Sequence, residues 1–342
     1  MKATVTIREV AAGAGVSIAT VSRVLSGADT VSPELAARVE ATARRLGYRT
    51  NRVARALRRQ STQTIGFVVP DITNPFFPAV IQAVEATLRK AGLSLLLCDA
   101  GNDVAAEAEL VRNLFDHQVD GLLISVCDRI ASRHAVRLAA SHGPVIQIDR
   151  RTLGEMPYVG INHAGVIAQL VDHLRSQGCR RYAYITPHTG ISTAKERLDA
   201  FLRGVRPLDP TVEDRVYMGD FSLNWGHEAA QRIIAQRPLP DVIACANDLI
   251  ALGAVQALRE HHIKIPQEVA VTGFDDTILA VASQPRLTTV RQPVEDIGMQ
   301  AVTMLRSAIA NPRLPPRSAV LDATLIVRES SKRERARQAA EP

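Results

Sequence analysis

Short apolar runs alternate with longer amphipathic segments from residue 64 onward. The runs TIGFVV, LSLLLC, DGLLIS and PVIQID follow one another within residues 64–149, and stretches of helical length such as 78–91 and 104–117 separate them. Continuous apolar runs of this length are typical of strands that are buried on both faces of a parallel sheet. The alternation therefore predicts a doubly wound α/β arrangement.

The same alternation resumes after Asn162, with the runs RYAYIT, DVIACA and VAVTGFD. Two alternating halves predict two α/β lobes within one body, which we place at residues 62–330. The expected boundaries of the lobes are about 62–161 and 292–320 for lobe one, and about 162–291 and 321–330 for lobe two. The charged tail, residues 331–342, is too polar to build a core, so we predict that it is disordered.

The first 49 residues follow a different pattern, with apolar positions at helical spacing. The sequence TIRE at residues 6–9 is a capping box that starts a helix. Ser17 can cap a second helix, and Ser32 followed by proline marks the start of a third. The glycines of residues 13–15 make the connection between the first two helices tight. Three short helices around a tight glycine turn match the helix-turn-helix plan.

The positive charge of the chain is concentrated in this N-terminal part. The formal net charge is +6, but residues 1–62 hold 11 basic and 4 acidic residues, whereas the remainder is nearly neutral. Such asymmetry is typical of a polyanion-binding head on a neutral body. A solvated basic surface without a partner is the alternative that charge alone leaves open. The helix-turn-helix plan favours DNA, because arginines around a groove-fitting helix meet phosphates.

The segments VTIREVAAGAGVSIATVSRVLSG and VSPELAARVEATARRLGYRTNRVARALRR resemble the DNA-binding head of the LacI/GalR (lactose-repressor) family of bacterial transcription regulators. The resemblance continues to about residue 330. It implies a helix-turn-helix domain at 1–49, a hinge helix or linker at 50–61, and a periplasmic-binding-protein-like body. It also implies that the chain binds double-stranded operator DNA as a homodimer, with a tetramer left open.

In that family the second helix enters the major groove, and the hinge helix contacts the minor groove. At the matching positions, Arg23 can bind guanine through two hydrogen bonds and Ile18 can touch a thymine methyl group. Leu57 matches the residue that wedges between base pairs and kinks the duplex. The residues expected at the DNA are Thr6, Ser17, Ile18, Ala19, Thr20, Ser22, Arg23, Asn51, Arg52, Ala54 and Leu57.

Polar residues follow several predicted strands of the body, where ligands bind in sheets of this kind. Carboxylates, amides, two arginines and aromatic faces suit a polyhydroxylated ligand. Considered one at a time, Phe76 and Phe77 are more typical of core residues, and Asp248 and Asp276 can be helix caps. The whole set resembles ribose-binding proteins of the periplasmic type, which implies a pentose sandwiched by the three phenylalanines. The matching residues are Asn74, Phe76, Phe77, Asp149, Arg150, Arg197, Phe221, Asn247, Asp275 and Gln292.

The sequence argues against an enzyme, a membrane protein and a secreted protein. It lacks the G-x-G-x-x-G, P-loop, H-E-x-x-H and G-x-S-x-G motifs, any run of 18 apolar residues, and an apolar signal segment. Four scattered cysteines without a C-x-x-C pair indicate reduced core thiols. We therefore expect a cytoplasmic protein without a cofactor or a metal site.

The expected function is a repressor of sugar-utilisation genes that a pentose such as ribose releases. The alternative is a regulator that responds to another sugar, to a sugar acid, or to a purine acting as corepressor. An enzyme or a sugar-binding protein without DNA activity is less favoured, because neither explains the basic helical head.

Overall fold

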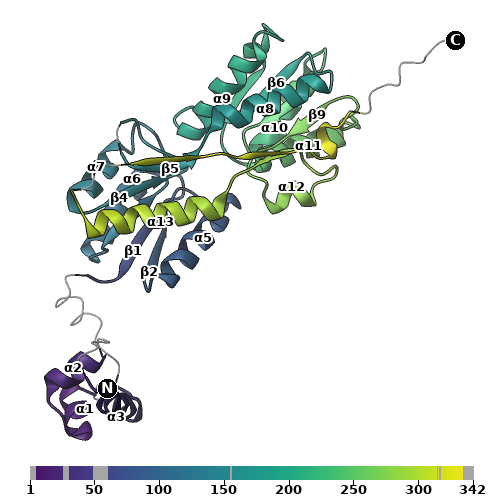
Figure 1. Cartoon of the computed structure of the whole chain (residues 1–342). Coiled ribbons are helices and arrows are strands. Elements are labelled where there is room, and N and C mark those ends of the chain that lie inside the picture. Colours follow the sequence, from purple (N-terminus) through teal and green to yellow (C-terminus); the bar gives the residue numbers. More distant parts are fainter. Residues whose placement is uncertain are drawn as a thin grey trace. The chain divides into compact units, whose positions relative to one another are not determined.

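The chain folds into two compact units, residues 1–62 and residues 63–342 (Figure 1). The computed structural model describes residues 5–25, 31–48, 61–154, 156–313, 315 and 317–333. The expected hinge therefore lies outside the described residues, apart from its last residue. Within the described part of the chain, no helix is long and apolar enough to cross a membrane.

The first unit contains the three helices that the sequence predicts. They are α1 (Ile7–Ala14), α2 (Ile18–Leu25) and α3 (Pro33–Leu46). The Glu9 carboxylate accepts hydrogen bonds from the backbone N (2.6 Å) and Oγ1 (2.9 Å) of Thr6 at the start of α1. Ser17 Oγ accepts a hydrogen bond from Thr20 N (3.1 Å) at the start of α2. Each helix start is thus set by local sequence.

Small side chains allow these short helices to pack closely. Gly15 ends α1 in the left-handed conformation, at φ 65°, which favours glycine and permits the tight turn into α2. The buried core of the unit consists of Val10, Ala11, Ala14, Val21, Val24, Val39 and Ala43. The second helix can therefore lie close to the first and third while its other face stays exposed.

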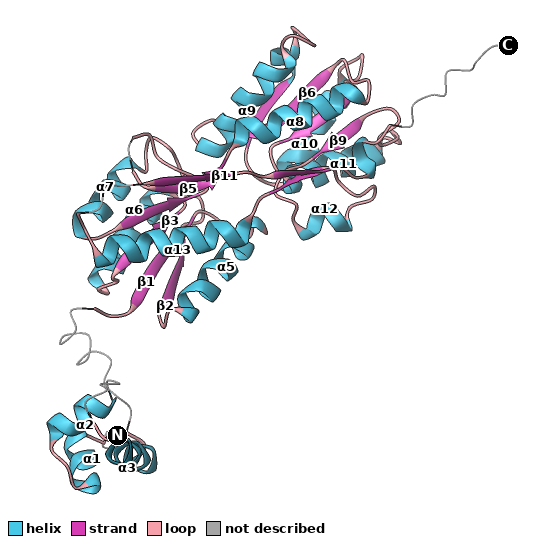
Figure 2. Cartoon of the chain, in the orientation of Figure 1, coloured by secondary structure: helices cyan, strands magenta, loops and turns pink. Residues whose placement is uncertain are grey.

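Lobe one of the second unit is a parallel six-stranded sheet with helices on both faces (Figure 2). Its strands, in spatial order, are β11 (Ser318–Leu321), β5 (Tyr158–Ile161), β4 (Val145–Ile148), β3 (Gly121–Ile124), β1 (Thr64–Val69) and β2 (Ser94–Asp99). Its helices are α5 (Phe76–Lys90) and α13 (Val294–Ala310), which pack together, and α6 (Val104–Asp116) and α7 (Arg133–His142), which form a second pair.

Lobe two repeats this plan around a parallel four-stranded sheet. Its strands, in spatial order, are β7 (Val216–Gly219), β6 (Tyr182–Pro187), β8 (Val242–Cys245) and β9 (Ala270–Thr272). Its long helices are α8 (His163–Ser176) and α9 (Ser192–Val205), which pack together, and α10 (Leu223–Ala235) and α11 (Asp248–Glu260), which form the other pair. Short helices complete it: η1 (Val212–Arg215), α12 (Ile278–Ala282) and η2 (Glu329–Ser331).

The chain crosses between the lobes after β5, after β10 (Thr289–Arg291) and after β11. The last crossing leads to β12 (Thr324–Ile326), which pairs antiparallel with β10. The strands predicted from long apolar runs are all present. The sequence analysis missed β5, β7, β10, β11 and β12, because these strands have only three or four residues and no long apolar run.

The prediction of a disordered tail from residue 331 is wrong for residues 331–333. Ser331 is buried, and its Oγ lies 2.6 Å from Thr288 Oγ1 and 2.8 Å from His173 Nε2. The Arg333 guanidinium donates hydrogen bonds to three backbone carbonyl oxygens of lobe two. A polar segment is ordered when the fold supplies partners for it, and composition alone does not reveal those partners. Residues 334–342 lie outside the described residues.

Lobe two also contains a buried ion pair between Asp209 and Arg215. Arg215 Nη2 lies 2.5 Å from Asp209 Oδ2, which also accepts the backbone N–H of Tyr182 at 2.8 Å. Burial raises the pKa of Asp209, but the hydrogen bonds from Arg215 and Tyr182 outweigh it and hold this pKa below its ordinary value. The ionised carboxylate therefore stabilises the fold at neutral pH, and this contribution is lost as pH falls through the lowered pKa.

We expect Asp209→Asn to lower the free energy of unfolding at pH 7 by about 3–5 kcal/mol, because Arg215 stays buried without a charged partner. Urea denaturation measures this loss, and the difference from the parent should shrink in acid. The control is Asp214→Asn, an exposed position of η1 next to Arg215, which should change stability by less than about 0.5 kcal/mol. An equal loss of unfolding free energy in both variants would contradict a stabilising ion pair between Asp209 and Arg215.

Candidate functional site

The second helix of the first unit presents its predicted DNA-contacting residues at the surface. Ile18 is 46% exposed, and Ala19 and Arg23 are exposed beside it, whereas Val21 and Val24 point into the core. The remaining described candidates, Thr6, Ser17, Thr20 and Ser22, also reach the surface. The hinge candidates Asn51, Arg52, Ala54 and Leu57 lie outside the described residues. One face of α2 is thus free to enter a groove while the other holds the unit together.

A cavity between the two lobes gathers most of the predicted ligand-binding residues. The loops that follow β1, β4, β6, β7 and β9 converge there, at the carboxyl ends of the strands. The lining residues are Asn74, Phe76, Phe77, Asp149, Arg150, Thr193, Arg197, Phe221 and Asp275. The free space between them is about 10 Å³, which is close to the room for one water. A sugar fits only if the lobes separate or side chains move.

Arg197 is fixed within lobe two by four contacts, the first of which is the hydrogen bond that its Nε donates to His163 Nδ1 at 3.4 Å. Its Nη1 donates to the backbone oxygen of Ala246 (2.7 Å), and its Nη2 lies 3.6 Å from Asp275 Oδ1. Its guanidinium carbon lies 3.7 Å from the centre of the Phe274 ring. On the other side, Gln292 Nε2 donates to Asp275 Oδ1 at 2.8 Å. The carboxylate of Asp275 is therefore held between a cation and an amide.

Arg150 lies in the slot between two phenylalanine rings. Its guanidinium carbon is 5.3 Å from the ring centre of Phe77 and 5.2 Å from that of Phe221. These are two of the three rings that the resemblance assigns to the faces of a sugar. The third, Phe76, packs edge-on against Phe77, with ring centres 5.3 Å apart. The guanidinium thus occupies the slot between Phe77 and Phe221.

Two predicted residues lie beside the cavity and carry unpaired amide atoms. Asn247 caps α11 by accepting the N–H of Ile250 (2.9 Å), as its place after β8 suggests. Its Nδ2 and the Oε1 of Gln292 are buried, and neither has a hydrogen-bond partner among the described residues. Buried amide groups without a partner are costly. They are suited to a ligand that offers both an acceptor and a donor.

Burial has the largest effect on the pKa values of the ionisable groups in the cavity. It raises the pKa of Asp149 to about 6, although Arg197 and Arg150 nearby lower it. It also raises the pKa of Asp275, against the opposing effect of Arg197, and lowers that of Arg150. His163, next to Arg197, has a pKa held well below its ordinary value by burial and by the neighbouring arginines. The cavity therefore offers both donors and acceptors to a polar ligand.

The backbone at the site is strained where the two aspartates emerge. Asp149 has φ 59° and Asp275 has φ 103°, a region that side chains other than glycine rarely adopt. Such conformations persist only when the surrounding structure enforces them, and they cluster at ligand-binding sites. Here the backbone N of Asp149 donates to Val159 of β5 and that of Asp275 donates to Val290 of β10, both at 2.9 Å, and these bonds hold the two residues in place.

Further contacts join the lobes next to the cavity. Arg129 donates from its backbone N and its Nε to the backbone oxygens of residues 190 (2.7 Å) and 189 (3.0 Å). The backbone N of Arg151 donates to Ser192 Oγ (2.9 Å), and its Nη2 lies 2.9 Å from Glu196 Oε1. Separation of the lobes along this edge would break all of these bonds, so they favour the closed arrangement.

Thr193 lines the cavity but is absent from the predicted set, and two aspartates have other roles than the sequence predicts. Thr193 lies four residues before Arg197 on α9, so helical spacing from the predicted arginine would have revealed it. Asp248 and Asp276 were considered as helix caps, but Asn247 caps α11 and Thr277 precedes α12. Asp248 instead accepts hydrogen bonds from Thr277 and Thr289, and Asp276 pairs with two arginines of the crossover segments. Long-range partners decided these roles.

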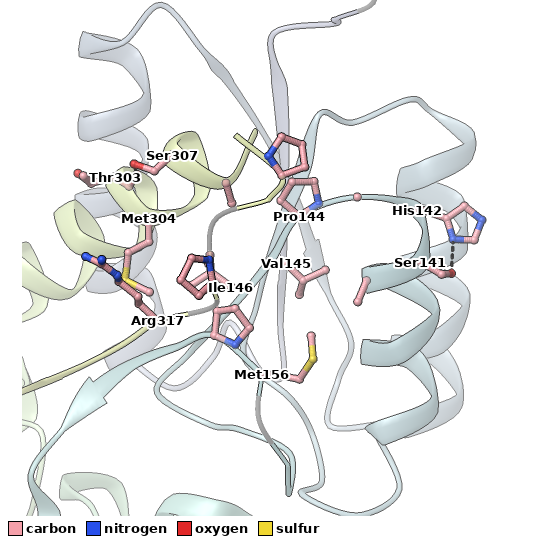
Figure 3. Close-up of a pocket in the computed structure, with 16 residues that line it drawn as sticks. Ser141, His142, Pro144, Val145, Ile146, Met156, Thr303, Met304, Ser307 and Arg317 are labelled. Atoms are coloured by element: carbon pink, nitrogen blue, oxygen red, sulfur yellow. Dashed lines mark hydrogen bonds between the residues drawn. The ribbon is translucent and has the colours of Figure 1, made fainter. Parts of the chain in front are cut away.

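A second hollow, of about 820 Å³, lies in lobe one, away from the cavity between the lobes. Figure 3 shows it between the end of α7, the start of β4 and α13, with Ile146, Met156 and Met304 among the apolar residues that line it. Its described lining residues include no carboxylate. Its chemistry does not suit a polyhydroxylated ligand, so it is not the predicted site.

We expect Asp149→Asn to change how stability depends on pH. A carboxyl group whose pKa is raised by folding favours the folded state in acid, and this benefit disappears as pH rises through about 6. The stability of the variant relative to the parent should therefore increase by about 1–2 kcal/mol between pH 5 and pH 8. Urea denaturation at both pH values tests this, with the exposed Asp116→Asn as control. If the stability difference between the variant and the parent were the same at both pH values, it would contradict a buried Asp149 carboxyl group with a raised pKa.

Comparisons with known proteins agree with both parts of this structure. The family model of bacterial regulatory proteins of the lacI family matches residues 6–51, and the model of the periplasmic binding protein-like domain matches residues 171–331. The lac repressor dimer bound to operator and the anti-inducer ONPF has the same fold, with a TM-score of 0.84 at 24% identity, over 96% of this chain and 99% of that one.

Two relatives align along almost their whole length. The chain is 31% identical to the HTH-type transcriptional regulator RegA of Clostridium saccharobutylicum, over 95% of this chain and 98% of that protein. It is 30% identical to the ribose operon repressor of Halalkalibacterium halodurans, over 96% and 97%. The chain therefore belongs to the lacI family of bacterial regulatory proteins and is a DNA-binding regulator of transcription rather than an enzyme.

Proposed function

We propose that the chain represses sugar-utilisation genes as a homodimer on a pseudo-palindromic operator, and that a pentose, ribose first, releases it. The observation that carries the effector proposal is the buried cavity between the lobes. It combines two guanidinium groups, two carboxylates and two phenylalanine faces with amide atoms that have no partner among the described residues. One relative is a ribose operon repressor, which supports the same sugar class.

In this proposal each group has a defined part in binding the sugar. Asp149, Arg150 and Asp275 hold the hydroxyl groups. Arg197 completes the network together with the amide side chains of Asn74, Asn247 and Gln292. The rings cover the apolar faces of the sugar. As the lobes separate to admit it, Phe221 moves away from Arg150 with lobe two, and Arg150 keeps its hydrogen bond to Asn102 in lobe one. The bound ligand has to favour one arrangement of the lobes, since equal affinity for two states shifts nothing.

Release of DNA would follow from the marginal stability of the hinge segment. A helix of about ten residues is not stable alone in water, so we expect it to form only where two copies meet on DNA. A change in the arrangement of the lobes that separates the two hinges then melts them. A shift from 1:99 to 99:1 needs about 5.5 kcal/mol of differential binding, which a cavity with this many buried polar groups can supply.

An apolar groove of about 870 Å³ across both lobes supports the homodimer. Its lining includes Ile72 and Leu97 from lobe one and Ile278 from lobe two, and Ile278 is 71% exposed. It also includes charged residues, among them Glu85 and Arg291. The neighbouring strand β2 lies at an edge of its sheet. A second copy of the chain would cover this surface and pair two helix-turn-helix units, as two half-sites require.

Operator binding tests the DNA-contacting face. We expect Arg23→Ala to weaken operator binding by about 1–3 kcal/mol and to relax base preference at one position in each half-site. Fluorescence anisotropy at fixed salt measures both effects, and the parent complex should contain two chains per duplex and weaken steeply as salt is raised. The control is Arg175→Ala, an exposed position on α8 that pairs with Asp172 and lies outside the groove. Tight binding of a single chain to one half-site would refute the dimer.

Calorimetry tests the effector. We expect D-ribose to release binding heat from the parent and to lower its operator affinity. Asp275→Ala should abolish both effects without weakening operator binding, because it leaves Arg197 and Gln292 without their acceptor. Heat from a purine or a hexose, with none from ribose, would refute the pentose and keep the repressor. Ribose binding that strengthens the operator complex would make the sugar a corepressor.

A further inference from the structure

Asn102 lies outside the predicted ligand-binding set but is bonded to one of its members. It follows β2 and precedes α6, in a loop of lobe one. Its Oδ1 accepts a hydrogen bond from Arg150 Nη1 at 3.3 Å, and its Nδ2 donates to Asp71 Oδ2 at 3.3 Å. The other oxygen of Asp71 accepts both the backbone N (2.9 Å) and the hydroxyl (2.6 Å) of Thr73. The loops after β1, β2 and β4 are therefore connected through this one carboxamide.

The two ends of the Asn102 side chain face opposite charges. The oxygen faces a guanidinium, and the nitrogen faces a carboxylate, so the orientation of the amide is fixed by its partners. An aspartate at this position would be repelled by Asp71, and a basic residue would be repelled by Arg150. The backbone adds a second restriction, because φ is 58° and the backbone N donates to Pro70 at 2.5 Å. Asparagine tolerates this left-handed conformation better than most residues.

Arg150 depends on this bond for its direction. Arg150 is 2% exposed. Among the described residues, Asn102 is the one acceptor that forms a hydrogen bond with its guanidinium. The rings of Phe77 and Phe221 restrict the guanidinium to their slot but do not set its rotation within that plane. A directional hydrogen bond at one Nη does set it, and this leaves the other N–H groups aimed at the cavity.

We infer that Asn102 is a positioning residue of the effector site: it orients the Arg150 guanidinium toward the ligand without touching the ligand itself. This inference rests on the proposed function of the cavity. According to this inference, the loop between β2 and α6 contributes to the affinity of the site for its ligand, although the predicted ligand-binding set includes no residue of this loop. It also explains why a short exposed loop carries an amide in a left-handed conformation where glycine would be easier to accommodate.

The full-length chain tests this inference with two substitutions at one position. Asn102→Gly keeps the backbone conformation and removes the carboxamide, and we expect it to weaken D-ribose binding about tenfold, as for loss of a hydrogen bond to a charged group. Asn102→Asp keeps the acceptor for Arg150 but repels Asp71, so its affinity should lie between those of the parent and the glycine variant. The control is Asn113→Ala, an exposed position on α6. Operator affinity without sugar should stay unchanged in all variants.

Binding can be followed through Trp225, the single tryptophan of the chain, whose Nε1 donates to the Thr186 carbonyl near Phe221. Unchanged ribose affinity in Asn102→Gly would overturn the inference. So would an Asn102→Asp variant that is weaker than the glycine variant, because the acceptor for Arg150 would then not matter.

A second measurement without ligand separates this inference from the proposed effector. In urea denaturation, Asn102→Gly and Arg150→Met remove the same bond, so the midpoint shift of the double variant should be smaller than the sum of the two single shifts. Additive shifts would overturn the positioning role even if ribose binds. If the parent does not bind ribose, the effector proposal fails, and the non-additivity alone decides whether Asn102 holds Arg150.

Discussion

The pairing of charges that lie buried between the two lobes is the constraint on which the body depends. Asp149 and Arg150 come from lobe one, and Arg197 and Asp275 come from lobe two, and all four are nearly inaccessible to water. A buried charge without partners is unstable. Arg197 and Asp275 pair within lobe two, and across the cleft Arg197 lowers the pKa of Asp149 and Arg150 lowers that of Asp275, so each lobe supplies charges that stabilise those of the other. A polar ligand that supplies the same hydrogen bonds can replace these partners. Two large lobes thereby become sensitive to one small molecule.

The site is maintained at the expense of stability. Two aspartates and an asparagine adopt left-handed backbone conformations, and burial raises the pKa of both carboxyl groups at the cavity. Buried amide atoms of Asn247 and Gln292 have no partner among the described residues. The large apolar cores on either side of the cleft, around strands such as β1 and β6, offset these costs. Function is therefore located where local rules of stability are broken.

The two units use side chains in different ways. The first unit has a core of alanines and valines, which allows short helices to approach closely and leaves Ile18 and Arg23 on an exposed face. In the proposed function, charge supplies affinity for DNA that depends on salt, and exposed side chains such as Arg23 supply the directional contacts to bases. The second unit is nearly neutral, and in the proposed function it recognises its ligand through directional hydrogen bonds in a buried cavity. A ligand can therefore act on the second unit without competing for the first.

Local sequence determined the three helices of the first unit, the strands with long apolar runs, and the family. The capping residues Thr6 and Ser17, the left-handed Gly15 and the long apolar runs act through neighbours a few residues away, so the pattern alone predicts them. Motifs at strand ends also predicted most of the residues that the structure brings together at the cavity between the lobes. Only the tertiary structure decided the partners of these residues. It placed Arg150 between two rings, assigned Asp248 and Asp276 to the packing of the crossover segments, ordered Ser331, and brought Asn102 to Arg150 across 48 residues. Such pairings depend on which strand ends are neighbours in space, and a sequence pattern with a period of two or 3.6 residues carries no information about that order.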